Sequence, residues 1–311
     1  MRVLVTGGAG FIGSHVCDGF LANGDEVIVI DDLSHGRVGR LPEGVELYKE
    51  SVFSESLSAL VTEIGPELIC HHAAQVDVRE SVACPGNDAE VNVVGTVNLL
   101  EAARLAGARV LFSSTGGAIY GEDAPVPTPE GASAAPGSPY GVAKYCAEQY
   151  IALYNRMYGA EHAILRFANV YGPRQGASGE AGVVSVFCAN SVQGKPLTIY
   201  GDGRQTRDYV YVGDCVAALL AAAGYGKAGI WNIGTSTEVS VLDLAALVSR
   251  ATGRRSERVF APARTGELSR SALDWQQAAT DLGWRPVTSL ADGVQAVVRW
   301  FEDGTPDRAA R

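Results

Sequence analysis

The chain has 311 residues, enough for a large hydrophobic core and for one or two closely joined domains. Apolar residues make up 47% of the chain and charged residues 19%, proportions that exclude a disordered or fibrous protein. The formal net charge of −10 argues against nucleic acid as a partner, because phosphate contacts need clustered lysine and arginine.

The start of the chain and its cysteines predict a cytoplasmic protein that does not enter a membrane. Residues 1–7 run directly into a predicted strand and turn, which leaves no room for a signal peptide. The sequence has no stretch of about 18 apolar residues, so no membrane-spanning helix is expected. Six cysteines are scattered without metal-ligand spacing, a pattern that predicts buried thiols in a reducing compartment and no metal site.

Strands and helices are predicted in alternation along the first half of the chain. The expected strands are residues 3–5, 26–30, 45–48, 67–70, 109–112 and 162–167. The expected helices are residues 11–23, 57–64, 92–106 and 140–158. Alternating strands and helices form βαβ units, so we expect an α/β fold with a Rossmann-type, doubly wound parallel sheet.

From about Asn169 the pattern changes, because Gly172, Pro173 and Gly176 interrupt the periodicity. Later segments predict a strand at 207–212 and helices at 183–193, 217–223, 241–252 and 290–301. We therefore expect a first domain of residues 1–168 and a smaller, mixed α/β domain of residues 169–311. Some of the later chain is expected to return to the first domain.

A glycine-rich turn lies between the first strand and the first helix, with Gly7, Gly10 and Gly13 at the spacing of a dinucleotide-binding turn. Backbone N–H groups and a helix N-terminus meet a pyrophosphate at such a turn. Asp31 ends the next predicted strand, where a carboxylate binds the ribose hydroxyls and repels a 2′-phosphate. The turn therefore predicts NAD rather than NADP. Asp32 is a further candidate ligand, with solvation or capping as its alternative role.

Tyr140 and Lys144 stand four residues apart in a predicted helix. Positions i and i+4 share one helix face, so the ammonium is expected beside the phenol. A cation there favours the phenolate form, which can act as a general base on a hydroxyl. The same spacing is also typical of an ordinary surface pair. The glycine turn upstream favours redox chemistry on an alcohol.

Four segments together resemble the extended short-chain dehydrogenase/reductase family that acts on nucleotide sugars, and the resemblance covers nearly the whole chain. They are the glycine turn at 6–13, the Tyr140/Lys144 pair, and residues 166–173 and 207–212. The resemblance implies NAD as the cofactor, bound by the first domain, and a UDP-sugar as the substrate, bound mainly by the second. It also implies a homodimer formed through helices near 91–106 and 140–158.

The resemblance assigns site residues as well. Thr115, at the end of a predicted strand, matches the hydroxyl residue that shares the substrate's proton with Tyr140. The implied catalytic set is Thr115, Tyr140 and Lys144. Its neighbours Ser113 and Ser114 are expected to be structural. The cofactor contacts that the resemblance implies are Gly7, Gly10, Phe11, Ile12, Gly13, Asp31, Asp32, Ser51, Val52, Ala73, Ala74, Gln75, Asn92, Tyr140 and Lys144. The implied substrate contacts are Thr115, Asn169, Arg174, Val183, Thr198, Tyr200, Arg207, Arg264 and Ser271.

Gly116 and Gly117 follow Thr115 at the place where related 4,6-dehydratases carry an Asp-Glu pair and decarboxylating relatives carry a Glu. Without an acid there, elimination lacks its catalyst and simple hydride transfer remains. The implied activity is NAD-dependent 4-epimerisation of a UDP-hexose through a transient 4-keto sugar. A nucleotide-sugar reductase or dehydratase is the second enzymatic interpretation. A redox-sensing binding protein is a third, disfavoured by the presence of Tyr140 and Lys144.

Three positions bear on the identity of the ligands. Ser51 stands where the family often has an aspartate that bonds the adenine amine, and a serine can still form a hydrogen bond. Ser271 stands where some members have a bulky tyrosine, which predicts room for N-acetylated sugars. Arg174 leaves two interpretations open. It pairs with a carboxylate at the sugar's C6, as a UDP-glucuronate 4-epimerase requires, or it orders its own loop.

Overall fold

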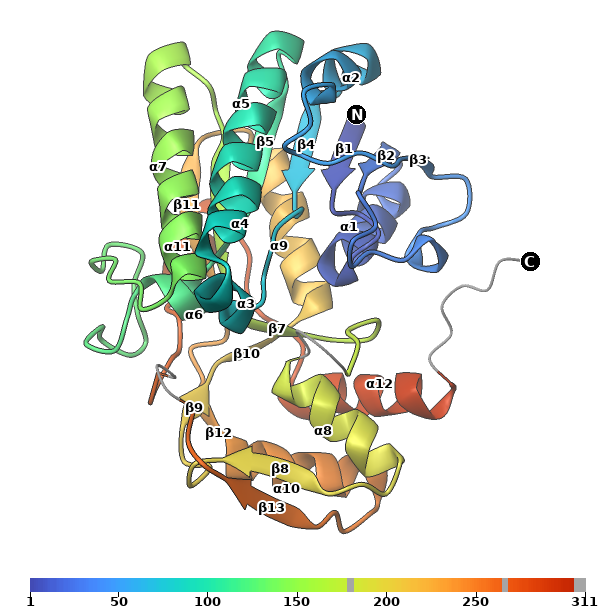
Figure 1. Ribbon diagram of the computed structural model, residues 1–311, viewed down its shortest axis with the longest axis vertical. Coiled ribbons are helices and arrows are strands. Elements are labelled where there is room, and N and C mark those ends of the chain that lie inside the picture. The colour runs from blue at the N-terminus through green and yellow to red at the C-terminus, as the bar shows by residue number, and fades with distance from the viewer. Residues whose placement is uncertain (178–181, 265–267, 305–311) are drawn as a thin grey trace.

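A seven-stranded parallel sheet forms the centre of the computed structural model, which describes residues 1–177, 182–264 and 268–304 (Figure 1). The strand order is β11-β6-β5-β4-β1-β2-β3. This order confirms the predicted Rossmann-type, doubly wound α/β fold. The strands are β1 (Arg2–Thr6), β2 (Glu26–Ile30), β3 (Glu46–Tyr48), β4 (Leu68–His71), β5 (Arg109–Thr115), β6 (Ala163–Phe167) and β11 (Gly229–Ile233).

Helices cover both faces of this sheet, because alternate strand residues point to opposite sides. Val3 and Val5 of β1 belong to the core that packs on one face against α1 (Phe11–Ala22), α9 (Val212–Tyr225) and α11 (Gln276–Leu282). Leu4, between them, belongs to the core on the other face. The helices there are α2 (Leu57–Ile64), α5 (Gly95–Ala106) and α7 (Pro139–Tyr158).

A second, smaller group of elements has a core of its own, which includes Phe187, Leu197, Leu244 and Val297. Its helices pack around the parallel pair β8–β13, and two short pairs, β7–β10 and β9–β12, connect it to the sheet. The elements are β7 (Asn169–Tyr171), α8 (Val183–Val192), β8 (Leu197–Tyr200), β9 (Thr206–Arg207), β10 (Tyr209–Tyr211), β12 (Val239–Ser240), α10 (Val241–Thr252), β13 (Arg258–Ala261) and α12 (Leu290–Glu302). The domain boundary at residues 168/169 stays a prediction; β11, α9 and α11 lie beyond it in sequence but pack on the large sheet.

The structure differs from the predicted elements in three ways. The strand expected at 207–212 is divided at Asp208, whose buried carboxylate accepts hydrogen bonds from the backbone of Thr235 and Leu273. The helix expected at 217–223 begins earlier, at Val212. Several elements were not predicted: β7, β8, β11, β12, β13, α11, the 3₁₀ turn η1 (Val38–Arg40), α3 (Val78–Ala83), α4 (Pro85–Ala89) and α6 (Gly116–Ile119). The first residues of the helix expected at 92–106 lie in a π-helical turn, η2 (Glu90–Val94).

The cysteines only partly match the prediction of buried thiols. Cys17, Cys70, Cys188 and Cys215 are buried. The prediction is wrong for Cys84, which is exposed because it lies in the junction between α3 and α4. Within the described ranges, no helix is both long and apolar enough to cross a membrane.

Candidate active site

The residues implied for the site gather at the carboxyl ends of the parallel strands. Gly7 follows β1, Asp31 follows β2, and Ala73 lies just past β4. Thr115 ends β5, and Asn169 lies just past β6. Ligands of open α/β sheets bind in the crevice outside these ends. In Figure 1 the arrowheads of β1 and β4 point toward the second group of elements, so the site lies between that group and the sheet.

The glycine turn is too tight for side chains. Gly7 has a φ of +69°, and a Cβ atom there would lie 2.6 Å from the Ala73 nitrogen. A Cβ on Gly13 would lie 2.1 Å from the Gly7 carbonyl oxygen. Gly10 precedes α1, and no described side chain caps this helix. The first N–H groups of the helix are therefore left for an anion.

Asp31 and Asp32 differ in their surroundings. The Asp31 carboxylate is buried beside the turn, where Oδ2 accepts from the Ala9 nitrogen and Oδ1 from the Leu33 nitrogen, both at 2.9 Å. Burial raises the pKa of Asp31 despite these bonds. Asp32 is exposed, and its Oδ1 accepts from the Ser34 nitrogen at 2.9 Å. Asp31 is therefore the acid placed at the turn, whereas Asp32 caps its own loop.

Two buried polar atoms near the ends of β3 and β4, Ser51 Oγ and His72 Nε2, have no hydrogen-bond partner in the parts of the chain that the structure describes. Buried polar atoms are rarely left unpaired, so these positions suit a polar ligand. Val52, next to Ser51, is buried against Gly95. Together with the tight glycine turn and the buried Asp31, these atoms fit a dinucleotide such as NAD.

Gln75 and Asn92 lock the loop that follows β4. The Gln75 backbone N–H donates to Asn92 Oδ1 at 3.1 Å, and Asn92 Nδ2 donates to the Gln75 backbone carbonyl at 2.9 Å. Both side-chain amides also donate to Asp88 Oδ1. Asp88 is 1% exposed, and burial raises its pKa. The loop of residues 73–75, implied to run past the nicotinamide, is thus held in place by hydrogen bonds to a buried carboxylate.

Lys144 lies one helical turn after Tyr140 on α7 and is buried. Ser138 caps this helix through a bond from the Gly141 nitrogen, so Tyr140 falls in the first turn. Lys144 Nζ donates to the Ser113 carbonyl at 3.1 Å and lies 4.7 Å from the centre of the Phe112 ring. Burial lowers the pKa of Lys144 to about 8, while the Asp88 and Glu148 carboxylates oppose that shift.

Thr115 and Asn169 approach the same point of the backbone. A Cβ on Gly117 would lie 3.8 Å from Asn169 Oδ1 and 3.9 Å from Thr115 Oγ1. Gly116, in contrast, is buried against Leu273, with 2.4 Å between a Cβ at this position and Leu273 Cδ1. Ser271, two residues before Leu273, is buried. The turn after Thr115 therefore lies between Asn169 and Leu273, and the apolar contact at Gly116 leaves little room for an acid at that position.

The residues implied to bind the nucleotide lie on the second group of elements. The Arg264 guanidinium stacks over the Tyr200 ring, 3.9 Å from its centre. Thr198 lies on the same strand, β8, and Val183 begins α8. Arg207, on β9, is half-buried, and its Nη1 donates to the Thr206 carbonyl at 2.7 Å. The ligand roles of these residues stay predictions.

Arg174 lies against the cofactor helix. Its Nη2 pairs with Asp18 Oδ2 of α1 at 2.6 Å, and the neighbouring Pro173 carbonyl lies 2.9 Å from His15 Nε2 on the same helix. Arg174 also has a φ of +68°, which is uncommon for a residue with a side chain. These contacts favour the second interpretation of Arg174, a residue that orders its own loop.

Two acids beside Lys144 were missed by sequence reasoning. Glu148 lies four residues after Lys144, so the helical spacing that pairs Tyr140 with Lys144 could have identified it. Asp88 stands four residues before Asn92, but the turn-like sequence Pro85-Gly86-Asn87 hides the short helix on which it lies. Only the tertiary structure brings Asp88 to Lys144.

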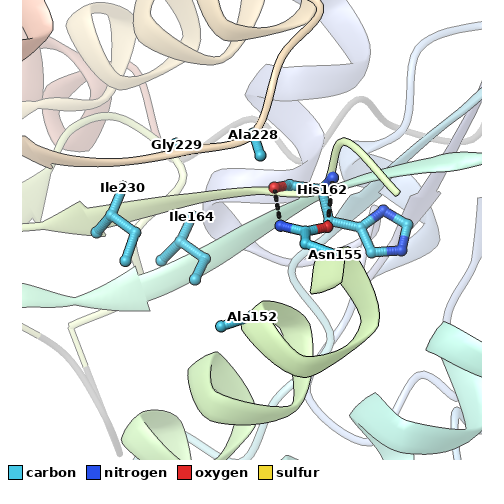
Figure 2. A pocket seen from close by; sticks show the side chains of 7 residues that line it. All are labelled: Ala152, Asn155, His162, Ile164, Ala228, Gly229 and Ile230. Atoms are coloured by element: carbon cyan, nitrogen blue, oxygen red, sulfur yellow. Dashed lines mark hydrogen bonds between the residues drawn. The ribbon is translucent and has the colours of Figure 1, made fainter. Parts of the chain in front are cut away.

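A small pocket of roughly 270 Å³ lies apart from this site (Figure 2). It opens where β6 and β11 begin, whereas the site residues lie where strands end. Asn155 and the backbone of His162 exchange two hydrogen bonds beside it. Burial lowers the pKa of His162 to about 4, so the ring is neutral near pH 7. The rest of the pocket lining is apolar: Ala152, Ile164, Ala228, Gly229 and Ile230.

The fold and the turn define a dinucleotide-binding α/β protein, and comparison with known proteins narrows the class. The model of the NAD dependent epimerase/dehydratase family matches residues 3–234. The chain is 44% identical to the UDP-glucose 4-epimerase of Mycolicibacterium smegmatis over 310 residues, which cover 97% of this chain and 99% of that protein.

Solved structures agree with this result. A UDP-glucose 4-epimerase of Thermotoga maritima, solved with UDP-glucose, has 44% identity, covers 98% of this chain and 100% of its own, and has a TM-score of 0.96. The enzyme of Thermus thermophilus, solved in complex with NAD, has 40% identity, the same two coverages and a TM-score of 0.93. The chain belongs to the NAD dependent epimerase/dehydratase family, whose members are extended short-chain dehydrogenases/reductases. The resemblance seen in the sequence is confirmed.

We predict that Gly13→Ala abolishes stable NAD binding, because the new Cβ would meet the Gly7 carbonyl and open the turn. NAD released from the purified, denatured protein should fall to below about a tenth of the wild-type amount. The matched control is Gly224→Ala, where a Cβ meets nothing within 4 Å. Wild-type NAD content in Gly13→Ala would contradict the assignment of the turn; circular dichroism checks that both variants are folded.

Proposed function

We propose that the protein is an NAD-dependent 4-epimerase that interconverts UDP-glucose and UDP-galactose. The observation that carries the proposal is the placement of Lys144. Its buried ammonium lies one helical turn from Tyr140 and bonds the strand that ends in Thr115. The kinship with UDP-glucose 4-epimerases over nearly the full length supports the same reaction.

Each residue of the catalytic set has a chemical task. Tyr140 accepts the proton of the sugar 4-hydroxyl as hydride leaves C4, and Thr115 shares that proton. Lys144 favours the phenolate form of Tyr140. Bound NAD supplies the hydride acceptor for C4 and the hydride donor for the return step. The 4-keto sugar turns about its bond to the diphosphate, takes the hydride on its other face and regains the proton from Tyr140, so no net redox change occurs.

The diphosphate is the charged part of the substrate and needs cationic partners. We assign this role to Arg207 and Arg264, with Tyr200 under the Arg264 guanidinium, because a planar fork suits phosphate oxygens. Asn169 is assigned to the sugar or phosphates, beside Thr115. The second group of elements thus mainly binds the nucleotide sugar, while residues 1–168 mainly bind NAD.

The alternatives have less support. A dehydratase needs acids after Thr115, but positions 116 and 117 are glycines, and Leu273 packs against Gly116. A UDP-glucuronate 4-epimerase needs a cation for the sugar carboxylate, but Arg174 pairs with Asp18 instead. A sensor without catalysis has no need of Tyr140 and the buried Lys144.

We also propose a cytoplasmic location, which fractionation of expressing cells would check.

A homodimer is a further part of the proposal. Helices α5 and α7 and the turn η2 that precedes α5 present exposed apolar side chains: Val94, Leu105, Val142, Tyr150 and Met157. A second copy that places its own α5 and α7 there would bury them. Sedimentation should give twice the 32.6 kDa chain mass, and Met157→Glu should shift it to the monomer. A wild-type monomer at micromolar concentration would refute the dimer.

The activity is tested by incubating the purified protein, without added cofactor, with UDP-glucose, UDP-GlcNAc or UDP-glucuronate, and by identifying the products by NMR. We expect UDP-galactose from UDP-glucose. Turnover of UDP-GlcNAc would support the role of the small Ser271, whereas its complete refusal would refute it. If UDP-glucuronate were the only sugar converted, this would support the interpretation that Arg174 binds the sugar carboxylate. No epimer from any sugar, with or without NAD, would overturn the proposal.

We predict that Tyr140→Phe lowers kcat for epimerisation by about 10²- to 10⁴-fold, because the proton of the 4-hydroxyl loses its acceptor. Tyr225→Phe removes an equally small group from a distant, exposed tyrosine and should leave kcat unchanged. A Tyr140→Phe enzyme within about twofold of wild type would exclude Tyr140 as the base.

We predict that Asp88→Asn moves the alkaline limit of activity to lower pH. Burial lowers the pKa of Lys144 to about 8, and the Asp88 carboxylate opposes this shift. Removing the Asp88 charge therefore lowers the pKa of Lys144 further. Lys144 then loses its proton, and with it its effect on Tyr140, at a lower pH. The alkaline arm of the kcat–pH profile should shift by roughly one unit. Asp303→Asn, the same change at an exposed site, should not move the arm, and an unshifted arm in Asp88→Asn would contradict the prediction.

A further inference from the structure

Arg166 of β6 and Glu148 of α7 form a buried ion pair. Arg166 Nε donates to Glu148 Oε1 at 3.0 Å, and its Nη2 donates to Glu148 Oε2 at 2.5 Å. Glu148 is 1% exposed and Arg166 5%. The site described above uses Glu148 only through its charge beside Lys144 and assigns Arg166 no role, and sequence reasoning did not predict the pair.

The pair connects the two elements that carry the proposed catalytic groups, α7 and β5, with the neighbouring strand β6. Glu148 lies on α7, on the same face as Tyr140 and Lys144. Ser114 Oγ donates to Glu148 Oε1 at 2.5 Å, and Ser114 directly precedes Thr115 on β5. Arg166 lies on β6, three residues before Asn169. One carboxylate therefore fixes α7, β5 and β6 relative to one another.

The remaining donor of the pair is also satisfied. Arg166 Nη1 donates to the Tyr120 hydroxyl at 2.7 Å, and that hydroxyl donates to Asn232 Oδ1 at 2.8 Å. The guanidinium lies over the Tyr120 ring, 5.1 Å from its centre. The network thus continues to α6, which Tyr120 follows, and to β11, which contains Asn232.

Stability alone gives little reason for such a network. Removing two charges from water offsets most of their attraction, and apolar residues of similar size would hold a core together as well. An apolar contact, however, lets a helix slide by fractions of an ångström, whereas a short charge-assisted hydrogen bond fixes both distance and direction. Proton sharing between two hydroxyls needs that kind of precision.

We propose that Ser114, Glu148 and Arg166 are positioning residues, which hold the Thr115 and Tyr140 hydroxyls in the geometry needed to share the proton of the sugar hydroxyl. The inference rests on the proposed function. The Ser114–Glu148 bond is its decisive contact, because it joins the strand of Thr115 to the helix of Tyr140. The expected signature is a loss in kcat without a loss in substrate or NAD binding.

The test is Ser114→Ala, which removes the bond and leaves the ion pair in place. We expect kcat for UDP-glucose to fall about 10- to 100-fold, with KM and NAD content unchanged. Ser249→Ala, which removes a serine hydroxyl bonded within α10, should retain wild-type kcat. Glu148→Met, which removes both carboxylate oxygens, and the double variant complete a cycle. Because both single changes break the same contact, the double variant should lose little more than the worse single one.

Two kinetic outcomes would overturn the inference: wild-type kcat in Ser114→Ala with only a lower melting temperature, or multiplicative losses in the double variant. Ser114→Ala decides alone if Glu148→Met, which leaves the Arg166 charge uncompensated, does not fold. Crystal structures of wild type and Ser114→Ala provide a readout independent of activity. The inference expects the Thr115–Tyr140 hydroxyl geometry to change, and an unchanged geometry refutes it. Failure of the proposed function would instead appear as wild-type protein that converts no UDP-hexose.

Discussion

The burial of the Lys144 ammonium is the interaction on which the rest of the site depends. A lysine that loses water loses much of its tendency to hold a proton, and here burial lowers its pKa to about 8. The drop from the ordinary value corresponds to roughly 3 kcal/mol against the charged form. The Ser113 carbonyl and two buried acids, Asp88 and Glu148, oppose this penalty. Without the two acids, the pKa of Lys144 would be lower still.

The two acids come from different parts of the fold, so the charge of Lys144 ties those parts together. Asp88 is held by Gln75 and Asn92, in the loop and helical turn beside the proposed nicotinamide site. Glu148 is held by Ser114 and Arg166, which lie on β5 and β6. The cofactor side and the substrate side of the site therefore share one electrostatic centre. A buried polar network of this kind stabilises a single arrangement only when nearly all its members are paired.

The sequence predicted features set by local spacing and missed those set by tertiary contacts. The glycine turn, Asp31 and the Tyr140/Lys144 pair have fixed spacings. The structure places the turn and Asp31 at strand ends and the pair on α7, where Lys144 bonds the Ser113 carbonyl of β5. Asp88 could not be predicted as a neighbour of Lys144, because a short helix of Pro, Gly and Asn reads as a turn. Asp208 divides an expected strand because residues far along the chain supply its hydrogen-bond donors. No local pattern contains that information.

The contact between Gly116 and Leu273 shows how the second group of elements bears on the proposed reaction. Leu273 pairs with Thr128 and donates its backbone N–H to Asp208, so its side chain is held against the turn after Thr115. An acid introduced at Gly116 would displace that side chain and disturb the segment that carries Ser271. A dehydratase-like site would therefore need a change in the packing of residues 271–273 as well as new acids. Ser271, to which we assign a role in sugar selectivity, and Leu273, which occupies the space beside Gly116, therefore lie on the same three-residue segment.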